Sequence, residues 1–224
     1  VDNQSTLEKI FSNFPKLIAT HCEDEQTILD NIEAYKKIDG IDASYHPKIR
    51  SREACYKSSS FAVNLAKKNN TRLHILHIST KEELALFQNN IALQEKKITA
   101  EACVHHLYFN DSDYQTLGNK IKCNPAIKSA DDAYLIAQAV SNNYIDVIAT
   151  DHAPHTIEEK NQSYWDAPSG LPLVQHSILI MNTLAQKYNW TIEFLVEKMC
   201  HNPAICFKIK DRGFIREGYY ADLV

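Results

Sequence analysis

Short apolar runs recur along the chain, and residues with helical spacing or turn residues separate them. The runs are KLIAT (16–20), RLHILHIS (72–79), KITAEAC (97–103) and IDVIAT (145–150). Each run has the length of a buried β-strand. Strands that alternate with helices along a chain usually pack as a parallel sheet with right-handed crossovers. The pattern therefore predicts an α/β fold with a parallel sheet.

Amphipathic spacing predicts the helices of this fold. The expected helices are 24–38, 49–70, 81–96, 129–143, 171–188 and 191–209. Acidic residues in the first turn of 24–38 favour a helix N-terminus, because they complement the positive end of the helix dipole. Ser129 is expected to cap the helix at 129–143 through its side-chain oxygen.

Composition restricts the class of protein. The chain has 224 residues, of which 44% are hydrophobic and 23% are charged, and its net charge is −4. These values are typical of a globular protein, and they give no basic surface for nucleic acid. No apolar run reaches the ~20 residues that span a bilayer, and VDNQSTLEKI does not resemble a signal peptide. The six cysteines form no C-x-x-C pair. We therefore expect a cytoplasmic protein with reduced thiols, a small-molecule substrate, and no nucleic-acid or membrane partner.

Ionisable side chains stand at the carboxyl end of each predicted strand. His21 follows the first strand, His77 ends the second, Glu101 lies near the end of the third, and Asp151 follows the fourth. The active sites of parallel α/β folds lie at the carboxyl ends of the strands. Two imidazoles and a carboxylate suit a divalent transition metal. The spacing therefore favours a metal site built from His21, His77 and Asp151.

Each histidine also has a structural explanation when it is taken alone. His21 could be a turn residue, and His77 could be a buried structural histidine within its strand. His74 points to the opposite face from His77, because side chains alternate along a strand, and we interpret it as structural. The pair His105 and His106 is interpreted as packing, or as support for nearby ligands. The joint placement at strand ends is what favours the metal site.

Several stretches together resemble a known family. They are THCEDE, LHILHIST, EACVHHLYFND, IKCNPAIKSADD, ATDHAPHTIEEK and NPAICFKIKDRGFIREGYYADLV. In this order they are similar to the second half of a dihydroorotase of the type I group of the amidohydrolase superfamily, and they cover nearly the whole chain. The stretch ATDHAPHTIEEK is the most specific. Related hydantoinases and allantoinases share its aspartate–histidine pair but usually lack the second histidine, here His155.

The resemblance implies strands five to eight of a (β/α)8 TIM-type barrel. Residues 1–209 would form this half of the barrel, and residues 210–224 would begin a C-terminal β-sandwich. The family's His-x-His motif, its bridging lysine or aspartate, and the arginine near its first motif have no match in the chain. We therefore expect a fragment with an incomplete metal site that is inactive alone. Its open sheet edges would favour association with another chain, so we expect a homo-oligomer.

The resemblance also implies a centre with two zinc ions. His21 and His77 match the imidazoles that hold the second zinc ion. Asp151 matches the aspartate that binds the first zinc ion and acts as general base and acid. The glutamate at the position of Glu101 touches an extra metal in some relatives.

The implied substrate contacts come from later loops. Asn124 and His155 match substrate-binding positions, and the backbone of Ser169 and Gly170 matches a loop that meets the substrate. The implied activity is the zinc-dependent, reversible hydrolysis of (S)-dihydroorotate to N-carbamoyl-L-aspartate in de novo pyrimidine (UMP) biosynthesis. Two alternatives remain open. One is another cyclic-amide hydrolase, such as an allantoinase or a dihydropyrimidinase, and the other is a non-catalytic dihydroorotase-like subunit that scaffolds a partner enzyme.

Overall fold

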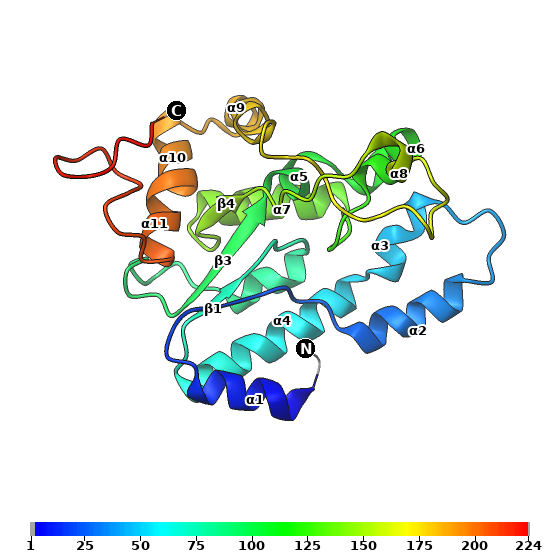
Figure 1. Cartoon of the computed structure of the whole chain (residues 1–224), viewed down its shortest axis with the longest axis horizontal. Helices are drawn as coiled ribbons and strands as arrows, with labels where there is room; N and C mark the ends of the chain where they lie inside the picture. Colours follow the sequence, from blue (N-terminus) through cyan, green and yellow to red (C-terminus); the bar gives the residue numbers. More distant parts are fainter. Residues whose placement is uncertain (1–2, 224) are drawn as a thin grey trace.

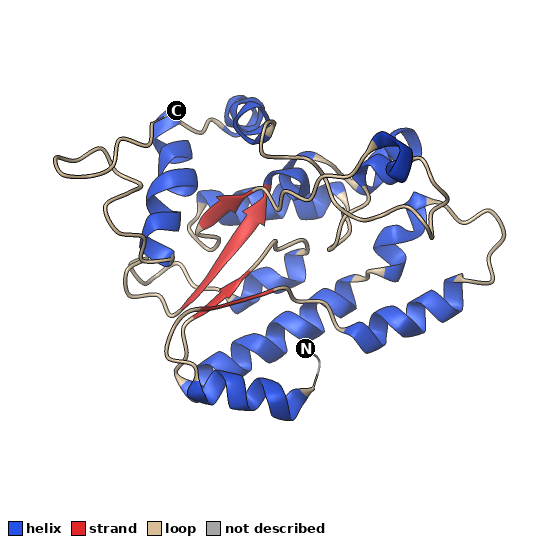
Figure 2. Cartoon of the chain, viewed as in Figure 1, coloured by secondary structure: helices blue, strands red, loops and turns tan. Residues whose placement is uncertain are grey.

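A parallel sheet lies at the centre of the fold. The structure, a computed structural model, describes residues 3–223. The strands are β1 (Ile18–Thr20), β2 (Leu73–Ile75), β3 (Ile98–Cys103) and β4 (Val147–Ala149). They lie in the order β1-β2-β3-β4, and each pairs in parallel with the next (Figure 2). The α/β class and all four predicted strands are therefore confirmed.

The helices connect these strands in chain order. The α-helices are α1 (Gln4–Asn13), α2 (Glu25–Tyr35), α3 (His46–Ile49), α4 (Arg52–Asn69), α5 (Val104–Tyr108), α6 (Tyr114–Leu117), α7 (Ala130–Ser141), α8 (Ile157–Lys160), α9 (Ser177–Tyr188), α10 (Ile192–Val196) and α11 (Asn202–Cys206). Short 3-10 turns are η1 (Ala43–Tyr45), η2 (Lys81–Leu86), η3 (Asp111–Asp113) and η4 (Gly118–Ile121). A π-helical turn, η5 (Glu197–His201), joins α10 to α11 without a break.

Helices pack along the sheet. Figure 1 shows α1 and α4 side by side next to β1, and α5 and α7 next to β4, with α9 beside α5. Both Leu73 and Ile75 on β2 are fully buried, and so is His74 between them. β2 is therefore buried on both faces, as strands of parallel α/β sheets and barrels usually are. Among residues 3–223, no helix is long and apolar enough to cross a membrane.

Side-chain caps fix the starts of the long helices. The Ser129 side chain accepts a hydrogen bond from the Asp132 amide, and the Asp132 side chain accepts one from the Ser129 amide in return. The predicted cap at Ser129 is therefore confirmed. Asp24 caps α2 through the Thr27 amide in the same way. Such a cap contributes about 1 kcal/mol to helix stability, because it pairs an amide that has no partner within the helix.

The predicted helix at 81–96 is wrong. Within this segment only Lys81–Leu86 is helical, and it forms a 3-10 helix. The rest of the segment is held by contacts with distant residues. The Asn89 side chain donates a hydrogen bond to the Asn142 carbonyl, and the buried ammonium of Lys96 lies 2.7 Å from the Asp146 carboxylate. These tertiary contacts override the good helix propensity of the segment.

Two further boundaries differ from the prediction. The helix expected at 171–188 begins only at Ser177, because Leu171 pairs with His152 in an isolated β-bridge. Within 210–223 the structure describes turns and loop without a strand. The division into domains 1–209 and 210–224 stays a prediction, and its outer ends at residues 1, 2 and 224 lie outside the described residues.

Candidate functional site

Two imidazole rings meet at the carboxyl ends of β1 and β2. His21 directly follows β1, and His77 lies two residues past the end of β2. The Nδ1 atom of His21 lies 2.9 Å from the Nε2 atom of His77, and the two ring planes make an angle of 72°. His77 is buried, whereas the side chain of His21 is 44% exposed. The fold therefore brings together two residues that lie far apart in the sequence.

Asp151 stands at the same edge of the sheet. It lies two residues past the end of β4, as His77 does past β2. Both residues have positive φ angles, 39° for His77 and 47° for Asp151. A residue other than glycine is uncommon in this region and stores about 1 kcal/mol of backbone strain. Strain at two matched positions after the strands is typical of a functional site.

Electrostatics favour a neutral His77. Burial holds the pKa of His77 below its usual range, and a positive charge on the neighbouring His21 ring would lower this pKa further. The carboxylate of Asp151 acts in the opposite direction, so it lies close enough to affect the ring. Within the described residues, the buried Nδ1 atom of His77 has no hydrogen-bond partner. A neutral imidazole offers a lone pair, which is the form that binds a metal.

A buried carboxylate orients His21. The Nε2 atom of His21 lies 3.1 Å from Oε2 of Glu23, and the Arg50 guanidinium donates to the same oxygen. Burial alone would raise the pKa of Glu23, but the His21 hydrogen bond and the Arg50 charge lower this pKa to about 2. Glu23 is therefore ionised and accepts the Nε2 proton. This tautomer leaves the lone pair of His21 on Nδ1, which faces His77.

Glu101 supports His77 from β3. One carboxylate oxygen lies 3.1 Å from Nε2 of His74, and the other accepts a hydrogen bond from the His77 backbone amide. The His74 ring is fully buried, and its Nδ1 atom pairs with the Thr99 hydroxyl. These contacts fit the structural interpretation of His74. They also tie the strained backbone at His77 to the neighbouring strand.

The predicted substrate loop is a second group of residues. The Nε2 atom of His155 lies 3.2 Å from the Ser169 carbonyl oxygen. Gly170 has a φ of 142°, and a Cβ there would lie 2.5 Å from the Ala153 carbonyl oxygen. Only glycine fits this position without a shift of the backbone. The loop therefore holds His155, Ser169 and Gly170 in direct contact.

A buried lysine closes this loop, and no sequence pattern predicts its role. The Lys160 ammonium donates to the carbonyls of Lys122, Pro168 and Gly170, at 3.0, 2.9 and 3.0 Å. Burial lowers the pKa of Lys160 to about 8. The Gly170 amide donates to the Lys122 carbonyl as well. A buried ammonium is satisfied when several carbonyls accept from it, so Lys160 fixes the course of 168–170.

Asn124 belongs to the segment that this lysine holds. Its side-chain oxygen lies 3.1 Å from Nε2 of the buried His46, and the peptide bond to Pro125 is cis. The Nδ1 atom of His46 lies 2.9 Å from the Tyr164 hydroxyl. Burial lowers the pKa of His46 to about 3, so the ring is neutral. The sequence does not predict the contact between His46 and Asn124, because 78 residues separate the two.

The predicted site residues thus form two groups. His21 and His77 form one, with Asp151 acting on His77 electrostatically, and the loop residues with Asn124 form the other. Between residues 3 and 223, no hydrogen bond joins the two groups directly. A cavity of about 740 Å³ lies beside β1, and His21, Glu23 and Arg50 are among the residues that line it.

The sequence matches a known protein family over most of its length. The model of the amidohydrolase family matches residues 14–224. The chain belongs to the amidohydrolase family. Among curated amidohydrolases it is 35% identical, over 211 residues, to a dihydroorotase of Methanosphaera stadtmanae; the match covers 93% of this chain and 48% of the relative. It is 34% identical over 181 residues to a dihydroorotase of Carboxydothermus hydrogenoformans, and this match covers 79% of the chain and 40% of the relative. The chain therefore spans about half the length of these relatives.

Solved structures of amidohydrolases share the fold. An L-hydantoinase (dihydropyrimidinase) from Arthrobacter aurescens has a TM-score of 0.87 and 25% identity, over 97% of this chain and 50% of that one. A Saccharomyces cerevisiae dihydroorotase in complex with 5-fluoroorotic acid has a TM-score of 0.64 and 16% identity, over 93% of this chain and 71% of that one. These likenesses fit a TIM-barrel-type α/β fold.

Proposed function

We propose that this chain forms part of a dihydroorotase, which hydrolyses (S)-dihydroorotate reversibly to N-carbamoyl-L-aspartate. In this assignment β1 to β4 are strands five to eight of a (β/α)8 barrel. The observation that carries the proposal is the meeting of His21 and His77 at adjacent strand ends, 2.9 Å apart, in a chain whose curated relatives are named dihydroorotase. The place of this reaction in pyrimidine biosynthesis, a cytoplasmic location and a homo-oligomeric state belong to the same proposal.

The two imidazoles at these strand ends fit zinc. A tetrahedral zinc ion holds two imidazole nitrogens about 3.3 Å apart, close to the spacing of His21 Nδ1 and His77 Nε2. The buried, unpaired Nδ1 of His77 shows that this ring has no other strong partner within the described residues. His21, His77 and Asp151 would hold the metal. When bound, zinc acts as a Lewis acid that polarises the amide carbonyl and lowers the pKa of water.

Asp151 carries the proton in this proposal. Its side chain is exposed at the carboxyl end of β4, where it can reach both solvent and a bound substrate. It takes a proton from the attacking water and delivers it to the ring nitrogen that leaves. A carboxylate suits this role because it accepts and returns a proton within one reaction cycle.

The loop residues bind and orient the dihydroorotate ring. His155, the backbone of Ser169 and Gly170, and the Asn124 amide offer hydrogen bonds to the ring and its carboxylate. Lys160 and His46 hold these groups in place through buried contacts. Fixed donors and acceptors lower the barrier, because the substrate loses less freedom at the transition state.

The test is a ring-opening assay on both this chain and the product of its complete open reading frame, with added zinc. Dihydroorotate is compared with dihydrouracil, hydantoin and allantoin at equal enzyme concentration. We expect the complete gene product to open dihydroorotate with the highest kcat/KM of the four. Turnover of none of the four by a folded, zinc-loaded protein would contradict the proposal.

A second candidate is a hydantoinase or dihydropyrimidinase. The observation that favours it is the TM-score of 0.87 and 25% identity with the L-hydantoinase from Arthrobacter aurescens. A higher kcat/KM for hydantoin or dihydrouracil than for dihydroorotate in the same assay would show that this second function is the correct one. His155 favours dihydroorotase, because related hydantoinases usually lack this second histidine.

A further inference from the structure

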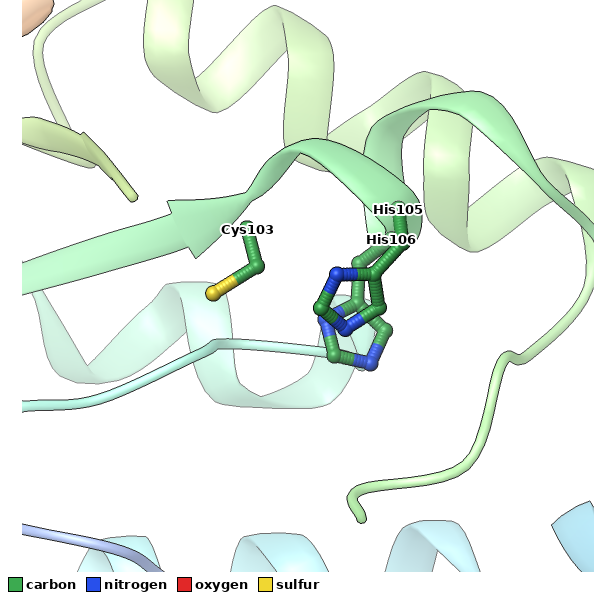
Figure 3. Close-up of side chains that lie close together, drawn as sticks. All are labelled: Cys103, His105 and His106. Atoms are coloured by element: carbon green, nitrogen blue, oxygen red, sulfur yellow. The ribbon is translucent and has the colours of Figure 1, made fainter. Parts of the chain in front are cut away.

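Three metal-binding side chains cluster where β3 ends and α5 begins. Cys103 is the last residue of β3, and His105 and His106 lie in the first turn of α5 (Figure 3). One ligand atom from each lies within 4.8 Å of the other two. Their exposed fractions are 0%, 1% and 3%. The cluster shares no residue with His21, His77 or Asp151.

The two imidazoles of this cluster are left without enough partners. Within residues 3–223, neither ring nitrogen of His105 has a hydrogen-bond partner, and Nδ1 of His106 has none. An unpaired buried polar group costs about 1–3 kcal/mol, so three unpaired nitrogens in one place are a substantial cost. Buried polar groups of this kind usually have a water, an ion or a function to explain them.

A side-chain hydrogen bond orients His106 as a ligand. Its Nε2 atom lies 3.0 Å from the Pro125 carbonyl oxygen, which can only accept, so Nε2 carries the proton. The lone pair of the neutral ring therefore lies on the unpaired Nδ1. Metal-binding histidines usually have this arrangement, in which one nitrogen donates to a carbonyl and the other binds the ion.

Burial keeps both rings neutral. It lowers the pKa of His105 to about 3. It also holds the pKa of His106 well below its usual range. Both rings therefore offer lone pairs at neutral pH. Their centroids lie 4.2 Å apart, so the two rings stay close together.

We propose that Cys103, His105 and His106 bind a zinc ion, separate from the centre at His21, His77 and Asp151. A thiolate and two imidazoles are ligands that zinc prefers. Binding converts the Cys103 thiol to a thiolate and releases that one proton to solvent. A water molecule takes the fourth position. Zinc needs its ligand atoms about 3.3–3.6 Å apart, so the side chains close by about 1 Å around the ion.

This site does not depend on the proposed function. Its ligands come from one short segment, so zinc would tie the end of β3 to the start of α5 and satisfy nitrogens that are otherwise unpaired. The sulfur ligand also gives the site a spectroscopic signature. The centre at His21, His77 and Asp151 has only nitrogen and oxygen ligands, so it gives no thiolate signal.

The experiment is a Co²⁺ titration of the complete gene product after removal of metal by a chelator. Thiolate-to-cobalt charge transfer absorbs in the near ultraviolet, and it reports only sites that contain a cysteine. We expect this absorption to rise to a plateau as Co²⁺ is added and to disappear when Zn²⁺ is added. Cys103→Ser should remove the absorption, and His105→Ala should weaken Co²⁺ affinity at least about tenfold.

Matched cysteine variants distinguish this site from others. Cys200→Ser changes an exposed thiol, and Cys123→Ser changes a buried thiol near Pro125; both should keep the absorption. Circular dichroism checks that each variant is folded. The proposal is overturned if wild-type protein shows no charge transfer, or if Cys103→Ser keeps it. Persistence in Cys103→Ser with loss in Cys22→Ser would place the cobalt beside His21 instead.

Discussion

The Nδ1 atom of His21 and the Nε2 atom of His77 face each other across 2.9 Å, although 56 residues separate them in the chain. The register of β1 and β2, which pairs Thr20 with Ile75, explains this contact. His21 follows one paired residue directly, and His77 follows the other after a single residue. Glu23 orients one ring and Glu101 supports the backbone of the other. The proposed metal centre depends on this contact between His21 and His77.

Replacing either ring should remove metal. We expect His21→Gln and His77→Gln in the complete gene product to lose about one zinc equivalent per chain, because each variant removes one of the two imidazoles. His176→Gln is the control, since His176 is exposed and has no proposed metal role. Elemental analysis after dialysis measures the zinc content. Unchanged zinc content in both variants would show that His21 and His77 are not metal ligands.

His155 should act on substrate and leave the metal in place. We expect His155→Ala to raise the KM for dihydroorotate about tenfold, or ~1.4 kcal/mol of binding, with unchanged zinc content. The reason is its contact with the Ser169 carbonyl in the substrate loop. Steady-state kinetics and zinc analysis on the same preparation measure both effects. A loss of zinc would make His155 a ligand instead.

Gly170 should resist even the smallest side chain. In Gly170→Ala the new Cβ would lie 2.5 Å from the Ala153 carbonyl oxygen, at a φ of 142°. We expect the free energy of unfolding to fall by about 2–3 kcal/mol and the KM for dihydroorotate to rise. Gly40→Ala is the matched control, because its φ is also positive but no atom lies within 4 Å of the new Cβ. That variant should lose only about 1 kcal/mol. Urea unfolding measures both free energies. Equal losses in Gly170→Ala and Gly40→Ala would show that the contact with Ala153 does not affect stability.

Asp132 joins α4, η2 and α7 through one buried carboxylate. It accepts hydrogen bonds from the Arg52 guanidinium, the Ser129 hydroxyl and the Lys81 amide. We expect Asp132→Asn to lower the free energy of unfolding by about 2–3 kcal/mol, because these bonds form with a charged acceptor. Asp131→Asn is the control. Asp131 pairs with the Lys81 ammonium at the surface, and such pairs contribute about 0–1 kcal/mol.

The effect of Asp132 should depend on pH. Burial raises the pKa of Asp132, but the hydrogen bonds from Arg52, Ser129 and Lys81 outweigh it and hold this pKa below its ordinary value. An aspartate whose pKa is lower in the folded state stabilises the protein fully at pH values above its unfolded pKa of about 3.9. This stabilisation is lost as the pH falls through the pKa of the folded state. The difference in the free energy of unfolding between wild type and Asp132→Asn should therefore be constant from about pH 5 to 7, because this range lies above both pKa values. The difference should shrink below pH ~4. A difference that stays constant to about pH 2 would contradict this origin.

The strands could be predicted because their local sequence pattern agrees with the structure. Each lies in a short apolar run that contains β-branched residues, and the run RLHILHIS contains β2, whose three residues are fully buried. The segment 81–96 misled the prediction for the opposite reason. Its residues favour a helix locally, but Asn89 and Lys96 have stronger contacts with residues beyond position 140. Such long-range contacts leave no local pattern.

The same distinction applies to the candidate site. His21 and His77 could be placed in one site because they follow strands, and strand order sets where they lie. The roles of His46 and Lys160 could not be predicted. The His46 contact with Asn124 and the three carbonyls around Lys160 exist only after the loops close. A lysine in a polar loop usually points to solvent, so nothing in the sequence indicates that this one is buried.

The turnover of dihydroorotate by Asp151→Asn in the complete gene product tests directly whether Asp151 carries the proton. The amide keeps an oxygen for the metal but cannot carry a proton, so zinc content should stay near that of wild type. We expect kcat to fall by about 100-fold or more, the usual contribution of a general acid–base group. A kcat within about tenfold of wild type, at equal zinc content, would contradict the account.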